Sequence, residues 1–124
     1  MPNNWTKEKR AEYNREYHAK NKAAQYVRVR RNKLKTVADN QQRVGAYLSE
    51  HPCVDCGEAD IVVLEFDHVR GDKVRNISEM VVRGWSMKTI QEEIDKCDVR
   101  CANCHRRATA ARGGQWKHKW IPMD

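Results

Sequence analysis

The sequence of 124 residues predicts an α+β fold, in which a long helical arm precedes a small mixed body. Three observations predict it. Residues 5–48 contain no proline and only one glycine, which permits a long helix. Ile61–Phe66 is a short β-branched run, typical of a buried strand. Helical spacing of apolar residues returns after Ser86, with Ile90 and Ile94 on one face.

The positive charge lies almost entirely in the arm. Residues 1–50 hold 12 Lys and Arg against 5 Asp and Glu, whereas residues 51–124 hold 12 of each kind. A basic arm on a near-neutral body favours a polyanion as partner, nucleic acid before an anionic membrane. The alternative is a solvated helix face that only keeps the protein in solution.

The arm has too little apolar surface to form a stable helix alone. Thr6 can cap its start, and Tyr13, Tyr17, Ala24 and Val27 recur at roughly helical spacing. We expect it to lean on the body, a second chain or DNA, with a possible break near residues 31–35. The side chains expected to bind phosphates along it are Arg28, Arg30, Arg31, Lys33 and Lys35.

The body is expected to span residues 51–114 and the short basic tail residues 115–124. His51-Pro52 ends the arm, because a residue before proline is disfavoured in a helix. The expected elements are a strand over 61–66, a returning strand from Val74, a helical turn over 78–83 stopped by Gly84, a helix capped by Ser86, and a last helix to about Arg112. No apolar run approaches the ~18 residues that cross a bilayer, and the N-terminus lacks signal-peptide features.

Two CxxC pairs, separated by 44 residues, predict a metal site. Cys53 and Cys56 form one pair, and Cys101 and Cys104 form the other. Two tight turns of this kind close a tetrahedral shell around Zn²⁺ and leave no open position, so the site would be structural. A redox CxxC or a disulfide framework is the alternative. Cys97 lies outside both pairs and is expected to be a small buried residue.

Asp67, His68 and His105 suggest chemistry beyond a structural ion. Asp67 and His68 end the strand after the first pair, and His105 follows the second pair. A common zinc ion would bring both segments together, so that Asp67 and His105 could share a divalent ion. A neutral imidazole at His68 could take a proton from water near pH 7, as phosphodiester hydrolysis requires.

Three segments resemble the four-cysteine HNH endonucleases of bacteriophages: Pro52–Gly57, Leu64–Val69 and Cys101–Arg107. The resemblance covers roughly residues 51–112 and implies a ββα-metal core. It implies that His68 is the general base and that Asp67 and His105 hold the catalytic ion, Mg²⁺ or Mn²⁺, with Zn²⁺ or Ni²⁺ as further possibilities.

The sequence departs from this family at the central Asn of its motif. Relatives usually carry it about five residues before the second CxxC, where Lys96 stands. Asn103 is the first candidate for the missing support of His68, and Asn76 is the second.

The resulting hypothesis is a DNA endonuclease, acting on duplex DNA and nicking as a monomer unless it forms a homodimer. Arg70, Arg106, Arg107 and Arg112 are expected to clamp the scissile strand. The alternatives are a non-catalytic zinc-finger DNA-binding protein or an accessory factor beside phage packaging proteins. No membrane association is expected, and the expected location is the cytoplasm, that of the bacterial host if a phage encodes the chain.

Overall fold

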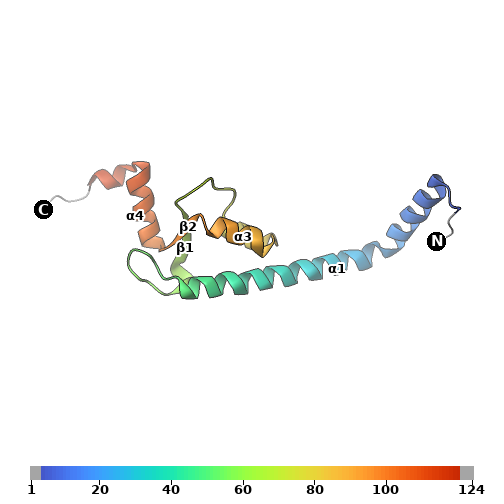
Figure 1. Cartoon of the computed structure of the whole chain (residues 1–124), viewed down its shortest axis with the longest axis horizontal. Coiled ribbons are helices and arrows are strands. Elements are labelled where there is room, and N and C mark those ends of the chain that lie inside the picture. Colours follow the sequence, from blue (N-terminus) through green and yellow to red (C-terminus); the bar gives the residue numbers. More distant parts are fainter. Residues whose placement is uncertain (1–3, 121–124) are drawn as a thin grey trace. The chain divides into compact units, whose positions relative to one another are not determined.

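The computed structural model describes residues 4–120, and these form an α+β protein (Figure 1). In chain order the elements are α1 (Lys7–Glu50), the 3₁₀ turn η1 (Ile61–Val63), β1 (Leu64–His68), α2 (Ile77–Val82), α3 (Met87–Ile94), β2 (Cys97–Cys101), α4 (Ala102–Gly113) and the 3₁₀ turn η2 (Trp116–Trp120). The chain divides into two compact units, one ending at Lys35 and one beginning at Thr36. Among the described residues, no helix is both long and apolar enough for a bilayer.

Helix α1 is unbroken, so the predicted break near residues 31–35 is wrong. That stretch holds no proline or glycine, and nothing in it interrupts the backbone hydrogen bonds. The predicted cap is confirmed, because Thr6 Oγ1 accepts a hydrogen bond from Lys9 N–H at 3.2 Å. The helix ends at Glu50, two residues before Pro52, as predicted.

The end of α1 belongs to the body. Asn40 and Val44 are its buried residues, and Val44 joins a core made by α2 and α3. Asn40 donates a hydrogen bond from Nδ2 to the Trp85 carbonyl at 2.9 Å. The arm expected over residues 1–50 therefore contributes its segment from Thr36 onward to the body.

The two strands form an antiparallel hairpin, and the partner of β1 is not where the sequence placed it. The return strand is β2, whereas Val74 lies in a loop and is exposed. In β2 the residues alternate between buried and half-buried, the period of two that a strand requires and that the segment from Val74 lacks. The predicted strand over 61–66 also begins later, at Leu64, after the η1 turn that Asp60 caps.

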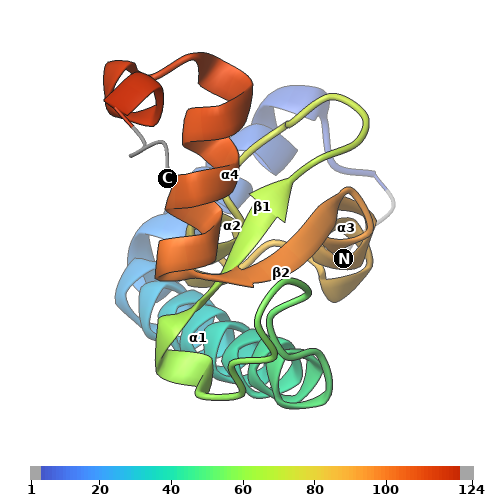
Figure 2. The ribbon, with the colours of Figure 1, turned by 90° about the vertical axis from the view of Figure 1, so that its left-hand side faces the viewer.

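The hairpin has one apolar face and one polar face. The cross-strand pairs Leu64–Cys101, Phe66–Val99 and His68–Cys97 share a face, because opposed residues in antiparallel strands point the same way. The pairs Glu65–Arg100 and Asp67–Asp98 lie on the other face. Helix α4 lies across the hairpin in Figure 2, and α4 contacts both strands.

Helices α2 and α3 close the apolar side as a short helical pair. Gly84, at φ 74°, ends α2 in a left-handed conformation that glycine adopts without strain. Ser86 then caps α3 by accepting a hydrogen bond from Thr89 N–H at 3.2 Å. Both features confirm the sequence predictions. The core between them is formed by Ile77, Met80, Val81, Ile90 and Ile94.

Candidate functional site

Four cysteines come together at one end of the hairpin. Their Sγ atoms all lie within 4.8 Å of one another, and Cys56 Sγ is 3.7 Å from Cys101 Sγ. The first pair sits in a tight turn, closed by a hydrogen bond from Gly57 N–H to the Cys53 carbonyl at 2.9 Å. The second pair spans the start of α4, where Cys101 caps the helix by accepting from Cys104 N–H. The cluster can hold one metal ion.

The electrostatics of Cys53 favour the thiolate that a metal requires. Burial raises the pKa of Cys53, but hydrogen bonds from backbone N–H groups of the two CxxC turns outweigh it and lower the pKa to about 6. Cys97 differs, because burial raises its pKa to about 11 and its thiol donates to the Glu93 carbonyl. Cys97 is a small buried residue, as predicted.

Asp67 is a buried carboxylate on the polar face, only 3% exposed. Arg112 Nη2 donates to both of its oxygens, at 2.7 and 2.9 Å, and Arg100 Nη1 donates to Oδ2 at 2.7 Å. Burial raises the pKa of Asp67, but the hydrogen bonds from Arg112 and then Arg100 outweigh it and lower the pKa below its usual value. Asp67 is therefore ionised and fully paired.

His105 stands between two carboxylates. Its Nδ1 donates to Glu65 Oε1 at 2.9 Å, and its Nε2 lies 3.5 Å from Asp67 Oδ1. When Nδ1 carries the proton, Nε2 presents its lone pair towards an ionised oxygen. Two electron-rich atoms face each other across this gap, a separation that two ligands of one cation can have.

His68 lies on the opposite face of β1 from Asp67, since successive side chains of a strand point to opposite faces. Its Nε2 lies 3.0 Å from Oε2 of Glu93, a residue of α3 that is 2% exposed. Burial raises the pKa of Glu93, but hydrogen bonds from Lys96, the Val74 N–H and His68 outweigh it and hold the pKa at about 2. Glu93 is thus a fixed anion that accepts the proton on Nε2.

One hollow joins His68 and His105 around the free edge of β1. It measures about 690 Å³, and both imidazoles line it together with Glu65 and Asn76. Its wall is otherwise mostly apolar, with side chains from the end of α1 and from α2. His68 and His105 therefore face one accessible space, although they approach it from different sides of the hairpin.

No known family model, curated protein or solved structure matches this chain.

The sequence did not single out the residue that holds His68. Asn103 is exposed, and its side chain makes no hydrogen bond within residues 4–120. Asn76 caps α2 by position and lines the hollow with His68. The support comes instead from Glu93, with Lys96 Nζ donating to Glu93 Oε1 at 2.8 Å and to the Asp72 carbonyl at 2.7 Å. An available signal was an acidic residue inside the apolar stripe of α3, between Ile90 and Ile94.

The arginines expected at the site have different surroundings. Arg70 Nη2 pairs with Asp98 at 2.6 Å, and its Nη1 donates to the Asp95 and Cys97 carbonyls. Arg106 and Arg107 are exposed on α4. The arm residues Arg28, Arg30, Arg31, Lys33 and Lys35 are all exposed on α1.

Proposed function

We propose that this chain is a metal-dependent DNA endonuclease of the HNH type. One observation carries the proposal: His68, held by buried Glu93, borders the same hollow as His105, whose Nε2 lies 3.5 Å from Asp67. A fixed imidazole beside an imidazole–carboxylate pair is the set that phosphodiester hydrolysis needs. Since residues 4–120 contain one such site, a single copy would nick one strand.

His68 would act as the general base. Because its Nε2–H donates to Glu93, the lone pair lies on Nδ1, which makes no hydrogen bond to any residue of the described range. Nδ1 can take a proton from a water molecule, and the Glu93 carboxylate stabilises the imidazolium that forms. The proton can then pass to bulk solvent through the open hollow.

Asp67 and His105 would hold the catalytic cation, which supplies charge neutralisation at the scissile phosphate when bound. Two protein ligands suffice for Mg²⁺ or Mn²⁺, because such ions keep several waters and bind substrate phosphates. Arg112 now occupies both oxygens of Asp67, so the pair fits an ion only when Arg112 turns away. The Arg112 side chain is 47% exposed and has room to do so, and a DNA phosphate would be its natural new partner.

The four cysteines would hold structural Zn²⁺. Tetrahedral Zn–S bonds of ~2.3 Å place the sulfurs about 3.8 Å apart, and Cys56 and Cys101 are separated by 3.7 Å. Four protein ligands leave no position for substrate, so this ion would fix the hairpin to the start of α4 rather than take part in hydrolysis.

The basic arm would supply sequence-independent affinity. Its exposed cations, Arg28, Arg30, Arg31, Lys33 and Lys35, can pair with phosphates and release counterions, which makes binding weaken steeply with salt. Arg106 and Arg107 would add contacts to the scissile strand.

Nicking of supercoiled plasmid tests the proposal. The wild-type chain is expected to nick with Mg²⁺ or Mn²⁺ and to stop when EDTA is added, and His68→Ala is expected to lose the activity. His18→Ala is the matched control, since His18 is an exposed imidazole in the N-terminal half of α1. Equal nicking by His68→Ala and His18→Ala, or no nicking by the wild type with any divalent ion, would reject the proposal.

A second candidate is a zinc-stabilised DNA-binding module without catalysis. It is favoured by the state of Asp67, whose carboxylate already pairs with Arg100 and Arg112 and needs no cation. Such a module would bind plasmid without nicking it under every metal condition. Gel-shift and nicking assays on the same preparation separate the two candidates.

A further inference from the structure

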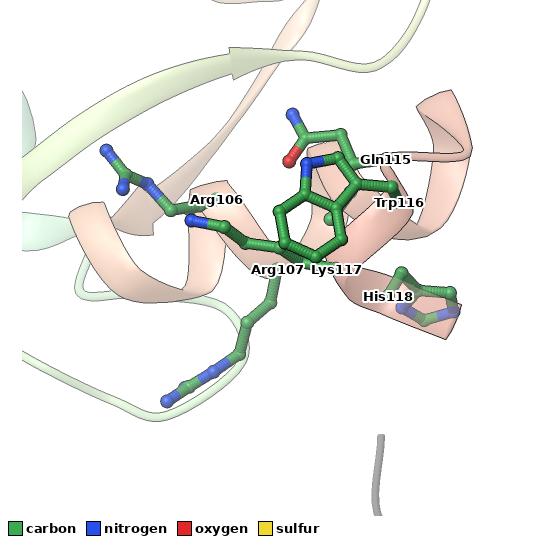
Figure 3. A pocket seen from close by; sticks show the side chains of 7 residues that line it. Arg106, Arg107, Gln115, Trp116, Lys117 and His118 are labelled. Atoms are coloured by element: carbon green, nitrogen blue, oxygen red, sulfur yellow. The ribbon is translucent and has the colours of Figure 1, made fainter. Parts of the chain in front are cut away.

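The surface beside the proposed active site contains an aromatic and basic hollow, of which the nuclease proposal uses only Arg106 and Arg107. It measures about 840 Å³ and lies between α4 and η2. Arg106, Arg107, Lys117 and His118 line it together with Trp116, and none of the described residues in its wall is acidic. In Figure 3 the two arginines extend on one side of the Trp116 ring and His118 on the other.

Trp116 is 66% exposed, although it lines a hollow. Lys117 Nζ lies 5.9 Å from the centre of its ring, so a cation already sits at this aromatic group. An open aromatic face ringed by guanidinium and ammonium groups matches the two parts of a nucleotide. The base can stack on the indole, and the phosphates can pair with the cations.

This hollow continues into the proposed active site. Arg106 and Gln115 also line a smaller hollow of about 250 Å³, which they share with Glu65 and His105. Glu65 and His105 in turn line the hollow that contains His68. The three hollows therefore share lining residues in series, from His68 past His105 and along α4 to Trp116, and we call this row of hollows the groove.

Helix α4, which runs beside the groove, has the length of a short oligonucleotide. Ala102, His105, Arg106 and Thr109 lie on one face of α4 at helical spacing and line its middle part. Helix α4, from Ala102 to Gly113, is about 16 Å long at 1.5 Å per residue. At about 3.4 Å per nucleotide in a stacked strand, that distance corresponds to about five nucleotides.

We propose that the groove binds an unpaired stretch of DNA, with one base stacked on Trp116 and its phosphates on Arg106, Arg107 and Lys117. Bases in a duplex are stacked on each other, so only an unpaired base can lie on the indole. The inference rests on the proposed nuclease function and narrows its substrate, from duplex DNA in general to DNA with a single-stranded segment at the cleavage site.

Binding by fluorescence anisotropy tests this groove without cleavage. The full chain is titrated, with zinc and no other divalent ion, against a labelled single strand and against the matching duplex. Trp116→Ala is expected to weaken single-strand binding about tenfold and to leave duplex binding unchanged. Trp116→Phe should keep most of the affinity, because the phenyl ring still stacks.

Trp120→Ala is the matched control, because Trp120 is a second exposed indole of η2 that does not line the hollow. Unchanged single-strand affinity in Trp116→Ala, or an equal loss in Trp120→Ala, would overturn the inference. Plasmid nicking measured in parallel separates it from the nuclease proposal. If the wild type does not nick but Trp116→Ala still weakens single-strand binding, the nuclease proposal fails and the groove proposal holds. If the wild type nicks but Trp116→Ala does not weaken single-strand binding, only the groove proposal fails.

Discussion

The functional side chains on the two faces of the hairpin lie in different environments. On the polar face, Asp67 is enclosed by Arg100 and Arg112, and both of its oxygens are used. On the apolar face, His68 is held at Nε2 by Glu93, and the residue lines an open hollow. The carboxylate on the polar face is thus fully paired with arginines, whereas the imidazole on the apolar face keeps one nitrogen without a hydrogen bond to the described residues.

Adjacent residues in a strand need not share an environment, because their side chains point to opposite faces. Asp67 and His68 are neighbours in sequence, yet they are stabilised by different helices, α4 and α3. His105 connects the two faces, since it contacts Glu65 and Asp67 and also lines the hollow of His68. Substitutions on either face should therefore have separable effects on stability and on activity.

Disrupting the four-cysteine cluster should unfold both faces of the hairpin at once. Cys53→Ser is expected to unfold the body, because structural zinc contributes about 10 kcal/mol or more to small domains. Thermal unfolding followed by circular dichroism measures this. Cys97→Ser is the control, as a buried cysteine outside the cluster. Similar melting temperatures for the two variants would contradict a structural metal.

Substitutions at the adjacent residues Asp67 and His68 should reduce stability to different extents. Asp67→Asn is expected to destabilise the body by about 3 kcal/mol, because Arg100 loses a buried partner. His68→Ala should cost about 1 kcal/mol, since Glu93 keeps its bonds to Lys96 and the Val74 N–H. Urea unfolding gives both values, and a larger loss for His68→Ala than for Asp67→Asn would refute the contrast.

Lowering the pH should reduce the stability of the fold, because it protonates Glu93, the partner of His68. Its pKa is about 2, below the ordinary 4.5, so the ionised carboxylate stabilises the fold above pH 4.5 and loses that contribution as pH falls through 2. The stability advantage of the wild type over Glu93→Gln, of the order of 2 kcal/mol at pH 6, should shrink towards zero near pH 2. Unfolding of both proteins across this range measures it. A stability difference between the two proteins that stays constant with pH would show that the charge of Glu93 does not stabilise the fold.

Removing the Arg112 side chain from Asp67 should make it easier for a cation to bind there. Arg112→Ala frees the Asp67 oxygens, so the Mn²⁺ concentration that half-activates nicking should fall a few-fold. Lys88→Ala is the control, because Lys88 is an exposed cation of α3 that has no part in the proposed site. An unchanged or higher Mn²⁺ requirement in Arg112→Ala would mean that Arg112 does not compete for the site.

Local signals in the sequence were sufficient for several features. Two CxxC pairs are enough to predict a four-cysteine cluster, because two residues between cysteines suit one tight turn. Capping by Thr6 and Ser86 and termination at Gly84 follow from backbone chemistry within a few residues. These features depend on neighbours along the chain, and the structure confirms them.

Long-range features could not be predicted in the same way. The strand partner of β1 was expected near Val74, but α2 and α3 lie between β1 and its partner β2 in the chain. Similarly, the support of His68 was sought among asparagines, whereas it comes from Glu93, 25 residues along the chain. Both depend on which buried faces pack together, and residue spacing alone does not determine that packing.

The most direct test is whether an external imidazole can replace His68. His68→Gly leaves a space at the edge of the hollow, which an imidazole molecule from solution can fill. We expect that this variant loses plasmid nicking and that added imidazole restores it. The restored activity should have the same ion requirement as that of the wild type. Full nicking by His68→Gly without imidazole would contradict a base at this position and, with it, the proposed division of roles between the two faces.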